Sequence, residues 1–572
     1  MATNVLLSPG VLARENDTSF INQRPPAVGA AIIGPTVRGP IGIPTLVTTY
    51  SDFAATFGDL LISGGAPYSY MTSIAAFNYF QNGGETLMIT RVVSNSLEWA
   101  PATAQISSST QAASQPAFEL ETLSEGVIMN SAGAQDSKGG LVSGSVNNLR
   151  WEVVSPNTSS GTFTLLIRRG DDNTNSPVIL EQWTQVSLDP LAPNYIEAVI
   201  GNYAFTYDVV NNQLNITGDY ANRSRYVRVK SVNNPTPNYL NSAAQVSVAS
   251  YTASLPIAQT GAFAGATGDI IAGVNFYNDI TATNTQGLTA GSYTNAIALM
   301  SNDDYKFNAL YTPGLIYEMA GHGAKIDTII QNTQNRGDSI YVLDLLDYGG
   351  TVNSATAQAN NLDTSYAATY WPWVSTRDSA TGRTVWVPAS TFIPGVYAFN
   401  DSVAEPWFAP AGINRGGLTR VIRAEYKLSV AQRDALYLSN INPLASFPGT
   451  GTAVYGQKTL QRKPSALDRV NVRRLLIVLK SYISRIATNL VFEQNTQTTR
   501  NIFLAQVIPY LESVQQRQGL YAFKVVMDGT NNSAEVIDRN ELIGQIYLQP
   551  TKTAEFIYLD FNITPTGATF PA

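Results

Sequence analysis

The sequence contains no cysteine and only one histidine, His322, among its 572 residues. These shortages exclude disulfide bonds, thiolate metal sites, cysteine nucleophiles and metal sites built from several histidines. Charge is also scarce, because charged residues make up 13% of the chain, about half of the roughly 25% found in ordinary soluble proteins. Asn, Ser, Thr, Gln and Gly fill the polar positions instead. Such a composition is typical of β-rich proteins that pack closely against their neighbours.

Long apolar segments are missing as well. The first residues, MATNVLLSPGVLAREN, lack the basic and apolar regions of a signal peptide, so none is expected. No run of about 18 apolar residues occurs, so we expect a soluble protein without direct membrane insertion. Hydrophobic residues nevertheless reach 44%, and at about 150 residues per domain the length predicts roughly four domains.

The charges are divided unevenly along the chain. Residues 411–572 hold 18 Lys and Arg against 11 Asp and Glu, a balance of +7. Residues 1–410 hold the remaining 17 against 31, a balance of −14. A basic C-terminal part predicts a negatively charged partner, which could be a protein, a nucleic acid or a membrane, and the alternative is a solvated basic helix face.

The N-terminal half alternates between short structural patterns. Residues 1–22 contain proline, glycine and polar clusters, and they are predicted to form an extended arm. Short β segments are predicted over 28–58, a helix over 68–80 and a strand over 87–93. Residues 100–250 are rich in Ser, Thr, Asn and Gly with alternating apolar positions, which predicts an all-β insertion.

The C-terminal half has longer patterns. Residues 307–347 follow the strand, helix and strand order of a βαβ unit. Residues 468–493 predict a long helix with one apolar face, formed by Leu475, Leu479, Tyr482, Ile486 and Leu490. A second helix is predicted from Phe503, Val507, Leu511 and Val514, with a bend at Pro509. Strands are predicted over 520–528, 541–550 and 554–563, followed by a second loose arm.

Two features suggest catalysis but lack the residues that it requires. GTAVYGQKT (451–459) has the glycine spacing of a P-loop, but Gln457 displaces Lys458 from the position that reaches the phosphates. His322 lies between two glycines, and no Gly-x-Ser-x-Gly motif exists to partner it, so a loop histidine is expected. Paired acids such as Asp303 and Asp304 leave a carboxylate enzyme formally open, but nothing else supports one.

Binding motifs are equally incomplete. Asp171, Asn173 and Asn175 imitate the first ligands of an EF-hand, but a serine replaces the turn glycine and Gln182 stands where the bidentate glutamate belongs. A polar turn explains this segment better, and the overlapping Arg-Gly-Asp tripeptide is interpreted as chance. Nucleic acid binding would need aromatic side chains interleaved with basic ones on an exposed sheet. We therefore expect no cofactor, no metal and no nucleic acid partner.

A series of short motifs gives the chain a family resemblance. Taken in order along the chain, they resemble the contractile tail sheath proteins of bacteriophages, densely over residues 300–572 and patchily over 1–95. The motifs are LLSPGV, GPTVRGP, DFAATFG, NGG before LMITRVV, YWPWV, WVPAS, GVYAFND, PWFAPAGINRG, SNINP, VYGQKT, DRVNVRRLL, LVFEQN, VIDRNELIGQIYLQP and AEFIYLDFN.

The resemblance implies a structural protein without enzymatic activity. Such a protein polymerises as stacked hexameric rings around a tail tube and contracts to drive the tube through the bacterial envelope, as in viral genome ejection. The implied partners are other copies of the chain, the tail tube protein, and the baseplate and tail terminator proteins. The implied location is the virion tail, after assembly in the host cytoplasm.

The expected fold class is a multidomain α+β protein, with α/β core domains from the N-terminal and C-terminal parts, a β-rich outer insertion and extended arms. The expected parts are an N-terminal arm (1–22), the N-terminal part of the sheath core (23–98), the β-rich outer domain or domains (99–290), an α/β middle domain (291–400), a basic α/β domain facing the tube (401–562) and a C-terminal arm (563–572).

The resemblance also implies two sets of contact residues. The arms that exchange strands between subunits are expected to use Leu6, Leu7, Val11, Leu12, Phe556, Tyr558 and Phe561. Arg473, Arg474, Lys480 and Arg485 on the long helix are expected to face an acidic tube, or else to pair with acids of adjacent subunits. The alternatives for the whole protein are the sheath of a headless contractile particle such as an R-type bacteriocin, and a β-rich surface-layer or adhesin protein.

Overall fold

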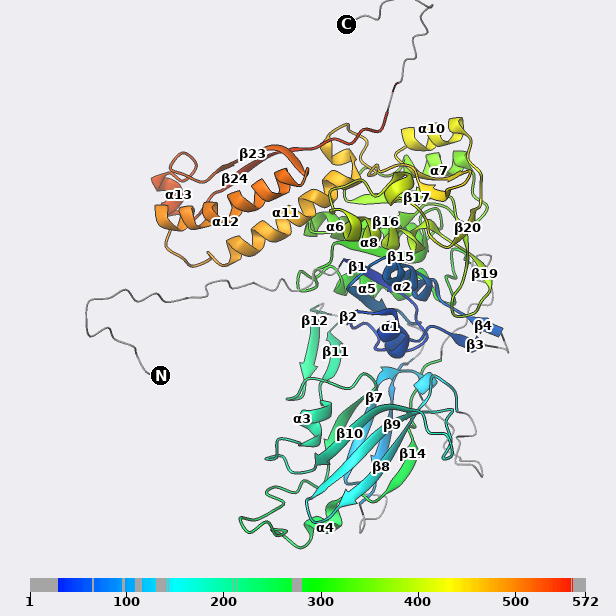
Figure 1. Ribbon diagram of the computed structural model, residues 1–572, viewed down its shortest axis with the longest axis vertical. Helices are drawn as coiled ribbons and strands as arrows, with labels where there is room; N and C mark the ends of the chain where they lie inside the picture. The colour runs from blue at the N-terminus through cyan, green and yellow to red at the C-terminus, as the bar shows by residue number, and fades with distance from the viewer. Residues whose placement is uncertain are drawn as a thin grey trace, which may run out of the picture.

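The computed structural model describes residues 29–63, 66–94, 98–108, 116–129, 141, 144–208, 210, 211, 213–269, 280–556 and 558. The molecule is elongated, with a β-rich part at one end, an α/β core at the other end and a helical C-terminal part beside the core (Figure 1). Strands from the beginning of the chain, in blue, lie in the core next to green strands from its middle. The predicted multidomain class with mixed α and β structure is confirmed.

An eight-stranded sheet forms the centre of the core. Its strands are β1 (Ala30–Gly34), β2 (Thr45–Val47), β5 (Leu87–Arg91), β15 (Ala309–Ile316), β16 (Ile340–Asp344), β17 (Ala367–Trp371), β21 (Asn442–Phe447) and β22 (Gly451–Val454). Their order is β2-β5-β1-β15-β16-β17-β21-β22, and only the edge strands β2 and β22 run antiparallel to their neighbours. Every residue of β1, β5, β15, β16 and β17 is buried, as expected for a parallel sheet that is covered on both faces.

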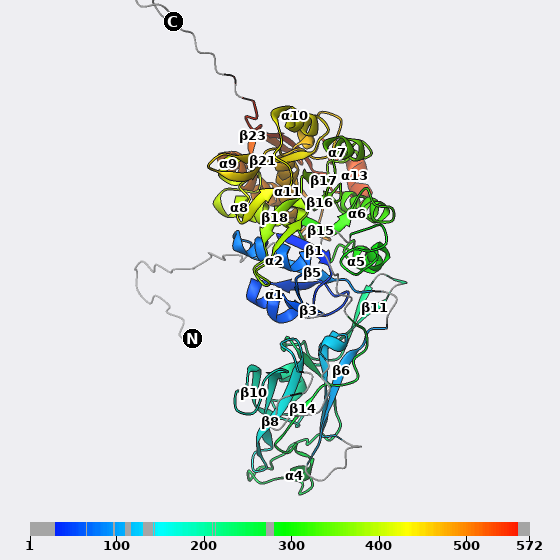
Figure 2. The same cartoon turned by 90° about the vertical axis from the view of Figure 1, so that its right-hand side faces the viewer.

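Helices cover both faces of this sheet. They are α1 (Tyr50–Phe57), α2 (Met71–Gln81), α5 (Thr294–Leu299), α6 (His322–Arg336), α7 (Val352–Ala359), α8 (Ile393–Val403), α9 (Gly412–Arg415) and α10 (Val430–Leu438). Figure 2 shows α2 and α8 on one side and α5 and α6 on the other. Ala30 and Ile32 of β1 belong to the apolar cluster that contains α2 and α8, whereas Ala31 and Ile33 belong to the cluster with α5 and α6. The alternation of side chains along the strand therefore supplies both cores.

Small elements flank the core. They are the pair β3 (Leu61–Ser63) and β4 (Ala66–Tyr68), the sheet of β18 (Val374–Arg377) between β19 (Thr384–Val387) and β20 (Val421–Ala424), and the 3₁₀ turns η2 (Ala290–Tyr293), η3 (Ala389–Thr391) and η4 (Ala466–Asp468).

The insertion between β5 and the middle strands is a β-sandwich with its own core. One sheet has the order β13-β7-β6 and the other β10-β9-β8-β14. The elements are β6 (Pro101–Ile106), β7 (Phe118–Glu125), η1 (Val127–Met129), β8 (Leu149–Asn157), β9 (Thr162–Arg169), β10 (Ile179–Ser187), α3 (Ile196–Ile200), the hairpin of β11 (Ala204–Asp208) and β12 (Gln213–Thr217), β13 (Val227–Val232), α4 (Tyr251–Ser254) and β14 (Gln259–Ala262). Phe118 of one sheet stacks on Phe163 of the other, with ring centroids 5.5 Å apart.

The C-terminal part is a helical hairpin covered by a two-stranded sheet. It contains α11 (Val470–Thr488), α12 (Gln497–Gln516), β23 (Leu520–Val526), α13 (Ala534–Asp538) and β24 (Gln545–Pro550). A fourth apolar cluster lies between these elements. In Figure 1 this part extends sideways from the core, and the end of the helical hairpin near α13 lies farthest from the core.

One local prediction is wrong. The segment expected to continue as short β structure up to residue 58 contains helix α1 instead. The Thr49 hydroxyl accepts a hydrogen bond from the Asp52 amide at 3.0 Å, which caps the helix, and Phe53 and Phe57 fill the core. Of the predicted strand 554–563, residues 554–556 and 558 have no strand structure, and the remaining residues lie outside the described part of the chain, so the strand stays a prediction there.

Candidate assembly surface of the C-terminal domain

The predicted contact helix is α11, and its apolar face is confirmed. Leu475, Leu479 and Ile486 are buried in the cluster shared with α12. Tyr482 of α11 stacks on Tyr510 of α12, with ring centroids 3.7 Å apart. This buried stripe determines which side of α11 is left for contacts with other molecules.

Arg473 and Arg474 do not lie on that exposed side. Only 3% and 5% of their surfaces are accessible. Arg473 Nε donates to the Ser365 carbonyl at 3.1 Å, and its guanidinium lies 3.9 Å from the centre of the Tyr366 ring. Arg474 donates from Nη2 to the carboxylate of Asp401. The expectation that these two charges line the helix exterior is wrong, because the first turns of α11 pack against the core.

Lys480 and Arg485 are exposed further along α11. Lys480 Nζ lies 3.4 Å from the Tyr366 hydroxyl, and the Arg485 guanidinium lies 5.5 Å from the Tyr482 ring. Neither cation has an ion pair with another residue in the described part of the chain. The tube-facing role stays a prediction, and in this chain it rests on these two residues.

The predicted arm residues lie at the margins of what the structure describes. Leu6, Leu7, Val11, Leu12 and Phe561 lie outside the described residues. Phe556 and Tyr558 are 69% and 91% exposed. Two aromatic side chains therefore point into solvent where the described chain ends, although burying each of them would be favourable.

The sheet of β23 and β24 is a second incomplete feature. Its inner face packs on α12 through residues such as Phe523 and Leu548, while Tyr521 and Tyr547 on the outside are 63% and 57% exposed. Within the described ranges, no third strand pairs with it. A two-stranded sheet is marginal by itself, and its free edges carry backbone groups that can bind another strand.

The turn between α11 and α12 was not identified from the sequence. Phe492 is 99% exposed and has a φ of 72°, and Val491 is 59% exposed. A bulky side chain with positive φ is uncommon in proteins. The sequence did contain a signal for this exposed turn. In LVFEQN, the apolar residues Val491 and Phe492 follow Leu490, which is the last apolar residue at helical spacing.

The remaining motifs have structural explanations. His322 is not a loop residue but the first residue of α6; it is fully buried, and its Nδ1 accepts from the Ile316 amide at 3.3 Å. Burial lowers the pKa of His322. The polar turn predicted around residue 173 is confirmed, because Asn173 Oδ1 accepts from the amides of Asn175 and Ser176, each at 3.0 Å. No group of three or more His, Asp and Glu in the described ranges could hold a metal ion.

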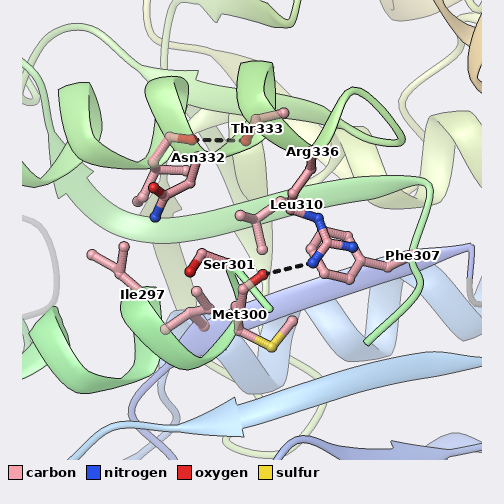
Figure 3. A pocket seen from close by; sticks show the side chains of 10 residues that line it. Ile297, Met300, Ser301, Phe307, Leu310, Asn332, Thr333 and Arg336 are labelled. Atoms are coloured by element: carbon pink, nitrogen blue, oxygen red, sulfur yellow. Dashed lines mark hydrogen bonds between the residues drawn. The ribbon is translucent and has the colours of Figure 1, made fainter. Parts of the chain in front are cut away.

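One small cavity lies between α5, α6 and β15 (Figure 3). It offers about 10 Å³, which is room for about one water molecule. Arg336 closes one side by donating to the carbonyls of Met300 at 3.2 Å and Tyr305 at 2.6 Å, and its guanidinium lies 4.7 Å from the Phe307 ring. The cavity is therefore a packing gap beside a structural arginine and is too small for an organic ligand.

Within the described ranges, every helix is too short or too polar to cross a membrane.

Comparisons with known proteins agree with the resemblance seen in the motifs. The profile of the phage tail sheath protein central domain matches residues 286–460, and that of the phage tail sheath C-terminal domain matches residues 462–564. The tail sheath protein of Vibrio phage KVP40 is 42% identical over 220 residues, which cover 38% of this chain and 33% of that protein. The tail sheath protein of Enterobacteria phage T4 is 38% identical over 226 residues, covering 40% and 34%. The chain thus spans about a third of the length of these relatives.

Solved structures share the fold over nearly the whole chain. The helical sheath of the anti-feeding prophage in its contracted state matches with a TM-score of 0.51 and 14% identity, covering 98% of this chain and 99% of that one. The sheath tail protein of Listeria innocua matches with a TM-score of 0.51 and 10% identity, covering 92% and 95%. At these identities the likeness concerns the fold. Together with the matches of the two domain profiles, these findings support the resemblance of residues 286–460 and 462–564 to the central and C-terminal domains of phage tail sheath proteins.

Proposed function

We propose that this chain is the structural subunit of a contractile tail sheath, without enzymatic activity. Copies assemble as stacked hexameric rings around a tail tube, and contraction drives the tube through a bacterial envelope. The observation that most supports this proposal is the incomplete β23–β24 sheet, which is followed in the chain by the exposed aromatic residues Phe556 and Tyr558. An edge that accepts a strand and a chain end that supplies one are the two parts needed for β-augmentation.

Strand exchange would give links that survive sliding. A net contribution of about 0.5–1.5 kcal/mol per main-chain hydrogen bond means that about eight to ten bonds contribute on the order of 5–10 kcal/mol before ordering costs. Such links need little side-chain specificity, so they persist while other contacts between subunits change.

The energy for contraction would be stored in packing between subunits. If the contracted arrangement buries an additional ~200 Å² of apolar surface per subunit, each subunit gains about 5 kcal/mol. Many subunits in series then perform the work without nucleotide hydrolysis. Consistent with this, the P-loop-like segment contains β22, an antiparallel edge strand that no helix follows directly.

The basic C-terminal domain would face the tube. Lys480 and Arg485 are exposed on α11 and free of ion pairs among the described residues, and residues 411–572 carry a balance of +7. Contacts of this kind are weak and screened by salt, which lets the sheath slide along an acidic tube. Baseplate and tail terminator proteins would bind the two ends of the sheath, and the virion tail is the expected location after assembly in the host cytoplasm. No nucleic acid or membrane contact is proposed.

A headless contractile particle is the second candidate, because the anti-feeding prophage sheath has the same fold. The presence or absence of a DNA-filled head on particles that contain this chain separates the two.

Electron microscopy of the purified full chain, alone and with a candidate tube protein, tests the main proposal. We expect hollow cylinders with sixfold symmetry. Chains that stay monomeric at every concentration and salt tested, with and without tube protein, would overturn it.

A further inference from the structure

Glu555 lies at the point where the described chain leaves the C-terminal domain, and three distant segments meet there. Its Oε1 accepts from Arg469 Nε at 2.7 Å and from Gln457 Nε2 at 3.0 Å. Its Oε2 accepts from Arg469 Nη2 at 3.0 Å and from the Tyr437 hydroxyl. Each carboxylate oxygen thus has two donors. Burial raises the pKa of Glu555, but hydrogen bonds from Arg469, Tyr437 and Gln457 outweigh this and hold the pKa below its usual value.

The groups that hold Glu555 are linked to the central sheet by further hydrogen bonds. Lys458, next to Gln457, donates from Nζ to the Tyr437 carbonyl at 2.8 Å and lies 4.2 Å from the Tyr437 ring. The Lys458 amide donates to Asn442 Oδ1 at 2.6 Å, and Asn442 Nδ2 donates to the Thr369 carbonyl at 3.0 Å. A force applied at Glu555 is therefore transmitted to β21 and β17 of the central sheet.

The residues before Glu555 are held as well. The Thr551 hydroxyl donates to the Gln518 carbonyl at 2.7 Å, and Gln457 Nε2 donates to the Thr553 hydroxyl at 2.6 Å. Immediately after Glu555, Phe556 is 69% exposed. The change from a chain held by its own subunit to a chain facing solvent occurs at Glu555.

These contacts also relate three sequence motifs that otherwise have no role. VYGQKT supplies Gln457, DRVNVRRLL supplies Arg469 and AEFIYLDFN supplies Glu555. The motifs are far apart in the chain and converge on one carboxylate. Stability alone does not require an anionic clamp at the end of a domain, since partly exposed ion pairs contribute little to folding.

We propose that Glu555 is the anchor of the C-terminal arm: Arg469, Gln457 and Tyr437 clamp it, so that the chain beyond it leaves in one fixed direction toward a second copy of the protein. The anchor fixes the position from which the arm reaches its binding site, which lowers the entropic cost of binding, and it carries tension from a neighbouring subunit into the central sheet. The part of this inference that concerns the neighbour rests on the proposed function.

Trypsin cleavage after Lys552 reports on the clamp in the unassembled full chain. Lys552 is exposed, but the segment around it must detach from its contacts before a protease can bind it. In Glu555→Gln we expect cleavage after Lys552 to be about tenfold faster, because the charge-assisted bonds to Arg469 are lost. Tyr437→Phe keeps the ion pair and removes one donor, so an increase of about threefold is expected.

The matched control is Glu541→Gln. Glu541 pairs with Arg539 at 3.1 Å in the same domain, and both side chains are about half exposed. This variant should be cleaved at the wild-type rate, and near-UV circular dichroism should show that all variants are folded. If trypsin cleaves Glu555→Gln after Lys552 at the wild-type rate, Glu555 is not a clamp for this segment.

Sedimentation at a series of protein concentrations tests whether the anchored arm binds a neighbouring subunit. We expect Glu555→Gln to raise the lowest concentration that gives sheath by about tenfold, and Glu541→Gln to leave it unchanged. Faster cleavage with unaltered assembly would overturn the positioning role. If the wild-type chain forms no sheath, the proposed function fails together with that role, and the cleavage rates still decide whether the clamp exists.

Discussion

Arg474 of α11 donates a hydrogen bond to Asp401 of α8, so a buried guanidinium joins the C-terminal domain to the core. The same guanidinium lies 4.5 Å from the Tyr397 ring. Burial lowers the pKa of Arg474, but Asp401 and the neighbouring tyrosines outweigh this effect, so the group stays charged. The contact makes the orientation of α11 part of the folded core.

Replacing Arg474 with alanine should therefore destabilise the single chain. We expect the loss of a buried charge partner to lower the free energy of unfolding by about 2–4 kcal/mol. Arg485 on the same helix is exposed, and its replacement with alanine should change stability by less than about 0.5 kcal/mol. Thermal denaturation of both variants measures the difference. Equal and small losses would contradict the structural role of Arg474.

Charge reversal on the exposed side of α11 should affect the tube contact instead. We expect Lys480→Glu with Arg485→Glu to abolish assembly on the tube at low salt, while the melting temperature stays within about 2 °C of wild type. Lys463→Glu, at an exposed lysine outside α11, serves as the charge control. Co-sedimentation with tube protein at two salt concentrations is the measurement. Normal tube-templated assembly of the double variant would show that this face does not contact the tube.

Removing either chain end should separate folding from assembly. Chains that lack residues 1–20, or everything after Asn562, are expected to be soluble and folded, because the described cores do not include these residues. They should fail to form sheath if the ends link the subunits. Size-exclusion chromatography and electron microscopy test this. If either truncated chain forms normal cylinders, the end that it lacks does not link subunits by strand exchange.

Asp344 predicts a pH dependence of stability. It is 4% exposed at the end of β16, accepts from the Ser390 amide at 3.1 Å, and burial raises its pKa to about 7. Because the folded state holds this proton more tightly than the unfolded state, the favourable contribution is complete below about pH 4 and is lost as the pH rises through 7.

Asp344→Asn should remove this contribution to the pH dependence of stability. Since three pKa units correspond to about 4 kcal/mol as an upper bound, we expect the variant to gain stability relative to wild type by about 1–3 kcal/mol at pH 8 and little at pH 4. Calorimetry at the two pH values measures the difference. A relative stability of the two proteins that does not change with pH would contradict the raised pKa.

Helices with a strong apolar period could be predicted from the sequence, whereas short or weakly patterned ones could not. In α12, Phe503, Val507 and Leu511 are buried as their spacing indicates. In α1, which has only eight residues, the β-like composition before it outweighed the capping pair Thr49 and Asp52. Short helices depend on tertiary packing for most of their stability, so the local pattern is a weak guide to them.

Local sequence patterns could not predict which strands pair with each other. Several apolar runs, such as those of β5, β15 and β16, indicated strands, but nothing in a run specifies its neighbour. Ala31 of β1 lies opposite Leu310 of β15. The whole β-sandwich is inserted in the chain between these two halves of one sheet, so neighbouring strands are far apart in the sequence. The same holds for Glu555, whose partners come from three distant segments.

By itself, the sequence determined the resemblance to tail sheath proteins, the mixed fold class and the buried face of α11, because motif order and apolar spacing are properties of the chain read in one dimension. Only the tertiary structure decided which cations of α11 reach solvent. Arg473 and Arg474 look as exposed as Arg485 in the sequence, but Ser365 and Asp401 come from other elements. A guanidinium can be buried only where such distant partners compensate its lost hydration, and that condition is met or missed in three dimensions.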